Sequence, residues 1–132
     1  MATKIKMVFD NQLHGILTGH HGSSQVGPAE GALDPYDMVL GGLGGCLNHT
    51  LQSILDKKRI KVQGIHYDIE GEKRTEPPTT LKYVDVRMQV RGADEEAKND
   101  IEKAFELATR YCSVYQTLSK VATMRPKLTF EE

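Results

Sequence analysis

The sequence predicts an α+β protein whose sheet is mostly antiparallel. Short segments of alternating apolar and polar residues open and close the chain. A long apolar repeat with helical spacing lies between them, and a second such repeat follows a predicted hairpin. The predicted order is two or three strands, a helix, two strands, two helices and a last strand, in one domain spanning residues 1–132.

The first predicted element is an N-terminal hairpin. Residues 3–9 alternate in polarity and turn at Asp10-Asn11, and a second strand over 13–18 pairs with them. Residues 20–33 are rich in Gly, Ser and Pro, which indicates a loop or an irregular edge strand.

A long helix is predicted next, beginning at Asp34-Pro35 and ending at Lys57. Asp34 can accept the free amides of the first turn, and proline at the first helical position has its φ already set. The helix contains four glycines, which together cost on the order of 4 kcal/mol of local stability relative to alanine. We expect another backbone, a partner helix or a substrate to approach closely there. These glycines are Gly41, Gly42, Gly44 and Gly45.

The second half of the chain predicts a long hairpin, two helices and a closing strand. Alternation over 60–62 changes phase before 65–69, which predicts a β-bulge at Gly64. The remaining expected elements are a turn at 76–78, a strand over 81–90, a helix over 97–110 capped by Gly92-Ala93-Asp94, a helix over 114–121 and a strand over 127–130.

Composition narrows the class of protein. A formal net charge of −1 argues against nucleic acid as a partner, because phosphate binding calls for surplus Lys and Arg. No apolar targeting segment or membrane span is evident, so we expect a cytoplasmic protein without a membrane partner. The cytoplasm disfavours structural disulfides, so Cys46 and Cys112 are expected to be free thiols or a transient catalytic bridge. The alternative is a pair of inert core cysteines.

Cys46 lies on the apolar face of the predicted long helix. His49 follows one turn later on the same face, and a protonated imidazole there would lower the pKa of the thiol. Asp37 lies nine residues earlier, too far for direct contact along a straight helix, so it would act only by orienting another group.

Cys112 lies at the expected break between two helices. Ser113 could cap the second helix, whose N-terminal partial charge would favour a Cys112 thiolate. The cysteines are 66 positions apart, and sequence alone does not establish that they are close. No Cys-x-x-Cys, His-x-x-x-His or Gly-x-Ser-x-Gly motif is present, so we expect no metal, no cofactor and no serine hydrolase chemistry.

Two segments resemble the paired cysteine motifs of the OsmC/Ohr superfamily, the osmotically induced and organic hydroperoxide resistance proteins. They are residues 34–46, ending in Gly44-Gly45-Cys46, and residues 108–114, which contain Cys112-Ser113. The resemblance implies an intertwined homodimer in which two six-stranded sheets wrap around paired central helices. The glycines would then lie where these helices cross.

The same resemblance implies a thiol peroxidase. Cys46 would attack an organic hydroperoxide, and Cys112 would resolve the resulting sulfenic acid as an intramolecular disulfide. A cellular dithiol, not identified by the sequence, would reduce that disulfide.

The chain departs from the motif of the well-studied peroxidases at two positions. Tyr36 occupies the place of a glutamate, and no arginine precedes Arg59. A cationic partner for Cys46 would have to be His49, His20, His21 or a lysine such as Lys4. These departures favour an alternative function, a non-catalytic redox sensor or a protein that binds a hydrophobic small molecule.

Overall fold

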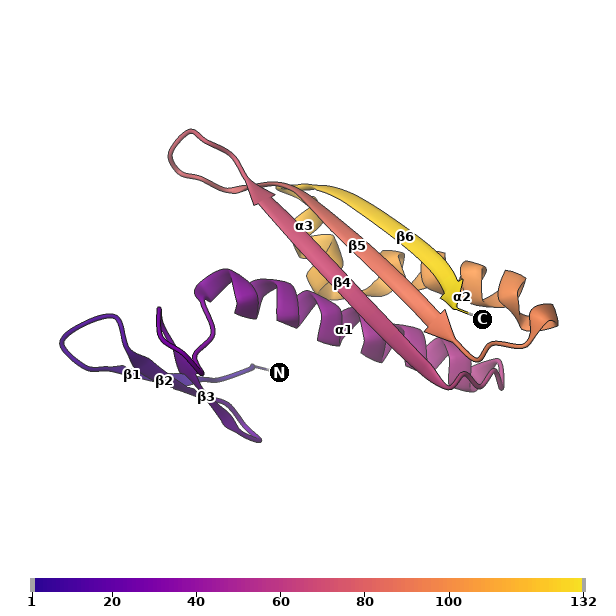
Figure 1. The fold of residues 1–132 in the computed structure, drawn as a ribbon, viewed down its shortest axis with the longest axis horizontal. Coiled ribbons are helices and arrows are strands. Elements are labelled where there is room, and N and C mark those ends of the chain that lie inside the picture. The colour runs from indigo at the N-terminus through magenta and orange to yellow at the C-terminus, as the bar shows by residue number, and fades with distance from the viewer. Residues whose placement is uncertain (1, 132) are drawn as a thin grey trace. The chain divides into compact units, whose positions relative to one another are not determined.

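The computed structural model describes residues 2–131, and its element order is the predicted one. The contacts divide the chain into two compact units, one up to Gly41 and one from Gly42 onward, which are described separately. The expectation of a single domain stays a prediction. The elements, labelled in Figure 1, are β1 (Lys6–Phe9), β2 (Gly15–Thr18), β3 (Ser23–Val26), α1 (Pro35–Lys57), β4 (Gly64–Lys73), β5 (Leu81–Arg91), the 3₁₀ turn η1 (Glu95–Ala97), α2 (Lys98–Tyr111), α3 (Ser113–Ser119) and β6 (Thr123–Glu131).

The first unit contains the predicted hairpin and one further strand. β1 pairs antiparallel with β2, and β2 pairs antiparallel with β3. The backbone N–H of Gln12 donates to the Asp10 carboxylate at 2.8 Å, which stabilises the turn between β1 and β2. β3 shows that the segment over 20–33 contains an edge strand, one of the two predicted alternatives.

Helix α1 begins at the predicted residue, but its capping hydrogen bond runs in the direction opposite to the expected one. The Asp34 backbone N–H donates to the Asp37 carboxylate at 2.9 Å, and the Asp34 carbonyl accepts the first helical bond from Met38 at 3.2 Å. Asp37 therefore supplies the third-position half of a capping box, and its negative charge also suits the helix N-terminus.

The other end of α1 closes with a Schellman turn. The Ile60 N–H donates to the Leu55 carbonyl at 2.9 Å and the Arg59 N–H to that of Asp56 at 3.1 Å, while Arg59 has a φ of 60°. This turn uses the Ile60 amide, so the strand predicted over 60–62 is absent and β4 begins at Gly64.

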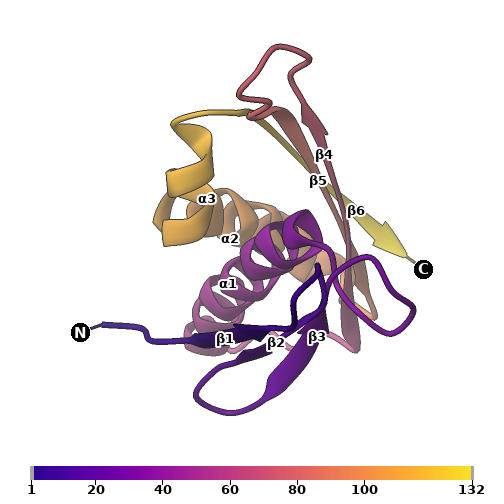
Figure 2. The same cartoon turned by 90° about the vertical axis from the view of Figure 1, so that its left-hand side faces the viewer.

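The second unit packs its helices against one face of the β4-β5-β6 sheet (Figures 1 and 2). β4 and β5 are antiparallel, and β5 and β6 are parallel, so three of the four strand pairings in residues 2–131 are antiparallel, as predicted. Alternate β5 residues, from Val84 to Val90, point into the core. The fully buried apolar side chains that meet there are Leu43, Leu47, Leu51, Leu55, Val84, Val86, Met88, Val90 and Ile101.

The predicted bulge at Gly64 is wrong, because the irregularity lies at the other end of the hairpin. Lys73 pairs with Leu81 and Glu72 with Tyr83, so Lys82 is the extra residue on β5. Because the bulge shifts the alternation of side chains by one residue, Leu81 and Val84 are both buried although they are three residues apart. The phase change in the sequence was real, but a loop rather than a strand precedes Gly64.

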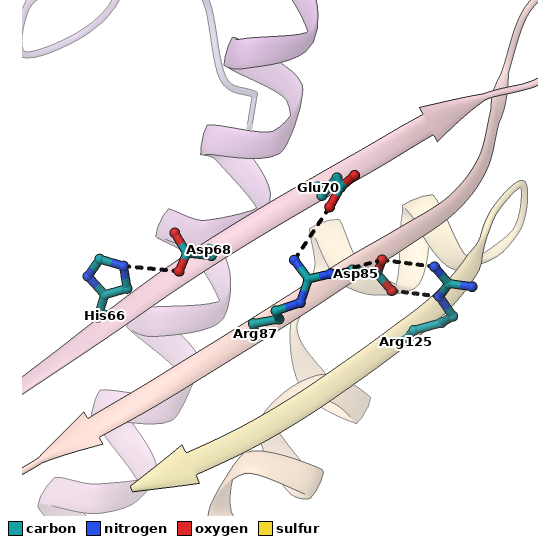
Figure 3. Close-up of polar contacts among 6 residues, drawn as sticks. All are labelled: His66, Asp68, Glu70, Asp85, Arg87 and Arg125. Atoms are coloured by element: carbon teal, nitrogen blue, oxygen red, sulfur yellow. Dashed lines mark hydrogen bonds and ion pairs between the residues drawn. The ribbon is translucent and has the colours of Figure 1, made fainter. Parts of the chain in front are cut away.

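The opposite face of this sheet is polar (Figure 3). Arg125 on β6 donates two hydrogen bonds, of 2.6 and 2.8 Å, to Asp85 on β5, and these hold the pKa of Asp85 below its usual range. The Arg125 guanidinium also lies 3.7 Å from the ring centroid of Tyr83. Asp85 and Arg125 are register partners, so this pair favours the observed alignment of the two parallel strands.

The left-handed conformation of Arg59 generates a stability prediction. A residue with a Cβ pays about 1 kcal/mol or more at positive φ, and glycine does not. Arg59→Gly should therefore raise the free energy of unfolding by about 1 kcal/mol, measured by urea titration. Lys58→Gly is the matched control, since Lys58 is outside the positive-φ region and should gain nothing. Equal effects of the two substitutions would contradict the assignment.

Candidate active site

Cys46 lies in the middle of α1 with its thiol half-buried. Leu43 and Leu47, both fully buried, fix this part of the helix in the core of the second unit. The Cys46 Sγ lies 3.9 Å from the Ser113 Oγ at the start of α3. The fold therefore brings the first cysteine to the segment that contains the second.

Cys112 forms the junction between α2 and α3. Its extended backbone, with φ −73° and ψ 114°, ends α2 while its N–H still donates to the Ala108 carbonyl. Its carbonyl accepts the first α3 bond from Gln116, and its Sγ accepts the Tyr115 N–H at 3.4 Å. The fully buried Cys112 thiol, not the Ser113 hydroxyl that the sequence suggested, therefore caps α3.

The environment of Cys46 favours its thiolate. Burial acts to raise the pKa of Cys46, but hydrogen bonds from the Val114 N–H, the Cys112 thiol, the Ser113 hydroxyl and the Ser113 N–H outweigh it, and the pKa falls below its ordinary value. The start of α3 was expected to stabilise the second cysteine, but its amides serve both sulfurs: the Ser113 and Val114 N–H groups donate to Cys46, and the Tyr115 N–H donates to Cys112 at 3.4 Å. Both cysteines are free thiols.

The environment of Cys112 has the opposite effect. Burial is the main cause that raises the pKa of Cys112 to about 11, and the neighbouring Cys46 sulfur contributes to this rise. The pair therefore consists of one thiol that ionises readily and one that stays protonated at neutral pH.

Two tyrosines that interact with Cys112, and an asparagine bonded to one of them, were not found by sequence reasoning. Burial raises the pKa of Tyr67 and of Tyr115, and charge on Cys112 adds to both effects. The Tyr67 hydroxyl donates to the Asn48 side-chain oxygen at 3.2 Å, which links β4 to α1. The sequence placed Tyr67 only in a strand alternation, and no local signal pairs it with a residue 19 positions away.

The other predicted site residues have different surroundings. His49 is exposed, and no hydrogen bond among residues 2–131 joins its imidazole to Cys46. The Asp37 carboxylate is engaged at the first turn of α1. The rings of His20 and His21 touch edge to face, with centroids 4.4 Å apart, between β2 and β3. The expected roles of these side chains and of Lys4 toward Cys46 stay predictions.

Two general features of the described residues bear on the class of protein. Within 2–131, no three His, Cys, Asp or Glu side chains gather as a metal-ligand set. None of the helices in that range is long and apolar enough to cross a membrane.

Comparison with known proteins identifies the family. The family model described as OsmC-like protein matches residues 27–127, so the chain belongs to the OsmC-like family, as its two cysteine motifs predicted. Protein YhfA of Escherichia coli strain K12 is 30% identical over 108 residues, covering 81% of this chain and 80% of that protein.

Solved structures share the α+β fold. The crystal structure of an OsmC-like protein from Mycoplasma pneumoniae covers 100% of this chain and 99% of its own, with a TM-score of 0.87 and 17% identity. An organic hydroperoxide resistance protein OsmC from Legionella pneumophila covers 98% of this chain and 97% of its own, with a TM-score of 0.74 and 13% identity. These likenesses confirm the predicted fold class.

The opposite pKa shifts predict unequal thiol reactivity. Alkylation requires the thiolate, so Cys46 should react with iodoacetamide more than about tenfold faster than Cys112 at pH 7.5 in the folded, reduced protein. Peptide-resolved mass spectrometry measures both rates in one sample. In urea the two rates should converge, because burial and the α3 amides are lost. Equal rates in the folded protein would contradict the asymmetry.

Proposed function

We propose that this chain is a thiol-dependent peroxidase that reduces organic hydroperoxides, with Cys46 as the reacting cysteine and Cys112 as the resolving one. The proposal is carried by the position of Cys46, whose sulfur lies 3.9 Å from the hydroxyl of Ser113, the residue next to Cys112, and by the opposite pKa shifts of these two free thiols. A nucleophile needs the thiolate, and a resolving thiol is best kept protonated until the first step is complete.

In the first step, the Cys46 thiolate attacks one oxygen of the O–O bond. A sulfur–oxygen bond forms and the O–O bond breaks, giving Cys46 sulfenic acid and an alcohol after the leaving alkoxide takes a proton from water. The half-buried position of Cys46 allows a substrate to reach the sulfur, whereas Cys112 is fully buried.

In the second step, the Cys112 sulfur attacks the sulfenic sulfur and releases water, which leaves a Cys46–Cys112 disulfide. An external dithiol then reduces this bond by thiol–disulfide exchange and is itself oxidised to a disulfide. The contact of the Cys46 sulfur with Ser113 supports this route, because Ser113 directly follows Cys112 and the fold therefore brings the two cysteines to the same place. The reducing conditions of the cytoplasm, the compartment we propose, would maintain the cycle.

The proposed substrate class is supported by the name of a structurally similar protein. A fold neighbour is described as an organic hydroperoxide resistance protein, and we extend that class of substrate to this chain. His49 and Asp37 stay in the proposed catalytic set, His49 as a cation near Cys46 and Asp37 as an orienting group.

One observation favours a second function, that of a redox sensor or a protein binding a hydrophobic small molecule. No lysine, arginine or histidine among residues 2–131 hydrogen-bonds to the Cys46 sulfur, and Tyr36 stands at the motif glutamate position. A thiolate held by neutral donors alone would oxidise more slowly than one beside a guanidinium.

We also propose the intertwined homodimer that the family resemblance implies. A Cβ added at Gly41, Gly42 or Gly45 would meet no atom within 4 Å, so the described chain itself does not explain these three helix-weakening glycines. Gly44 differs, because its Cβ would lie 3.1 Å from the Ile69 Cδ1. A helix from a second copy would account for these glycines, because two helix backbones can approach closely only where the side chains are small.

The dimer proposal predicts a specific effect of bulk at Gly45. Gly45→Leu should shift the sedimenting species from dimer to monomer, because a large side chain would separate the two helices. In the isolated chain the same change meets open space and raises helix propensity, so circular dichroism should show retained helix. Glu102→Leu, an exposed change on α2, is the control and should leave the assembly intact. A monomeric unsubstituted protein would contradict the proposal.

The catalytic proposal predicts distinct products from single-cysteine variants. With cumene hydroperoxide, the unsubstituted protein should form one intramolecular disulfide, and Cys112→Ser should instead accumulate a sulfenic acid that dimedone traps on Cys46. Cys46→Ser should form neither product and should consume no hydroperoxide. Both thiols remaining free after excess hydroperoxide would overturn the peroxidase function and leave the binding function.

A further inference from the structure

We infer that the Ser113 hydroxyl is a catalytic group that donates a hydrogen bond to the Cys46 thiolate and thereby sustains its reactivity. This inference rests on the proposed function, since it names the neutral side chain outside the cysteine pair that helps to activate the reacting cysteine. It was not among the roles that the sequence suggested for Ser113, which were limited to helix capping.

The geometry assigns the hydroxyl to Cys46. The Ser113 Oγ lies 3.9 Å from the Cys46 Sγ, and it has no other hydrogen-bond partner within residues 2–131. Sulfur has a larger radius than oxygen, and its hydrogen bonds are correspondingly longer. When Cys46 is ionised its sulfur is an acceptor only, so the hydroxyl must be the donor.

The Ser113 hydroxyl also does not cap α3, although its position at the start of the helix suggests that role. It is the first residue of α3, where a serine often serves the helix terminus, but the Cys112 sulfur already caps the helix through the Tyr115 N–H. The Ser113 carbonyl takes part in the helix by accepting the Thr117 hydroxyl at 2.8 Å. Loss of the Ser113 hydroxyl should therefore leave α3 intact.

Other neutral donors also lower the pKa of Cys46, and the Val114 N–H and the Cys112 thiol each contribute more than the Ser113 hydroxyl. Cys112, the ionisable group that interacts directly with Cys46, stays protonated because it is buried. The hydroxyls of Tyr67 on β4 and Tyr115 on α3 interact with Cys112, whose charge raises the pKa of both. His49 on α1 is exposed and makes no hydrogen bond to the sulfur within the described chain. The Ser113 and Val114 amides also donate, but these backbone groups are present whatever the side chain at 113.

The hydroxyl keeps its proton throughout the proposed step. The thiolate supplies the electron pair that forms the sulfur–oxygen bond, and the leaving alkoxide is protonated by water. Ser113 contributes by raising the fraction of Cys46 present as thiolate, as a charge-assisted hydrogen bond does. It does so without a formal cation.

The test measures the pH dependence of Cys46 alkylation by iodoacetamide in the full chain, resolved from Cys112 by peptide mass spectrometry. Ser113→Ala should raise the apparent pKa of Cys46 and slow its alkylation at pH 7 by about threefold to tenfold. Ser113→Thr, which keeps the hydroxyl, should restore the profile. Ser113→Val, similar in shape to threonine but without the hydroxyl, should behave as the alanine variant does.

Thr117→Ala is the matched control, because it removes a hydroxyl one turn further along the same helix without touching Cys46. Its alkylation profile should equal that of the unsubstituted protein. Thermal melting of all variants separates a change at the thiol from loss of α3.

Two results would overturn the inference. One is an unchanged Cys46 profile in both Ser113→Ala and Ser113→Val, and the other is a raised pKa in His49→Ala but not in Ser113→Ala. Because alkylation uses no hydroperoxide, a shifted profile in a protein that fails to reduce cumene hydroperoxide would retain the role of Ser113 and reject the peroxidase function alone.

Discussion

The break between helices α2 and α3 at Cys112 is the constraint on which the candidate site depends. A single extended residue ends α2, starts α3 and turns the Ser113 and Val114 amides toward Cys46. If α2 continued through this point, those amides would be used in helical hydrogen bonds and Cys112 would lie along a regular helix face. The same break therefore creates the donors for one thiol and buries the other.

The structure stabilises charge at Cys46 through many weak neutral donors rather than one strong cation. Each hydrogen bond from an N–H or O–H contributes modestly, but together they outweigh the cost of burial, and the pKa of Cys46 falls. A guanidinium would add a permanent charge to the site, whereas neutral donors act only when the thiolate is present. Under the proposed function, this difference would decide between a fast peroxidase and a slower sensor, and the neutral donors are the reason that the absence of an arginine before Arg59 does not by itself exclude catalysis.

Local patterns in the sequence predicted the elements but not all their connections. The alternation over 81–90 and the Asp34-Pro35 start signal gave β5 and α1 close to their observed bounds. β6 begins at Thr123, four residues before the predicted start at 127. Pro126 disfavours a strand in the sequence pattern, but β6 lies at the edge of its sheet, where a proline is acceptable. The Schellman turn at Arg59 was missed because a residue other than glycine adopts the positive φ.

The sequence likewise predicted only part of the candidate site. Glycines, cysteines and their motif spacing identified Cys46 and Cys112, because those residues carry a signal in themselves. Tyr67 and Asn48 lie on different elements and meet only after β4 packs against α1, so no periodicity reveals them. Ser113 was recognised as a residue at a helix start, but its relation to Cys46 depends on packing between residues 67 positions apart.

The open glycines of α1 extend this argument beyond one chain. Gly41, Gly42 and Gly45 together lower the stability of α1 by on the order of 3 kcal/mol relative to alanine. We expect a favourable interaction that requires small residues to offset this loss. The apolar core of the second unit anchors α1 through Leu43 and Leu47, which flank these glycines but do not need them to be small. The proposed homodimer would recover this cost at a surface outside the described contacts. A second copy of the same helix would present equally small residues and would permit close backbone packing on both sides of the interface.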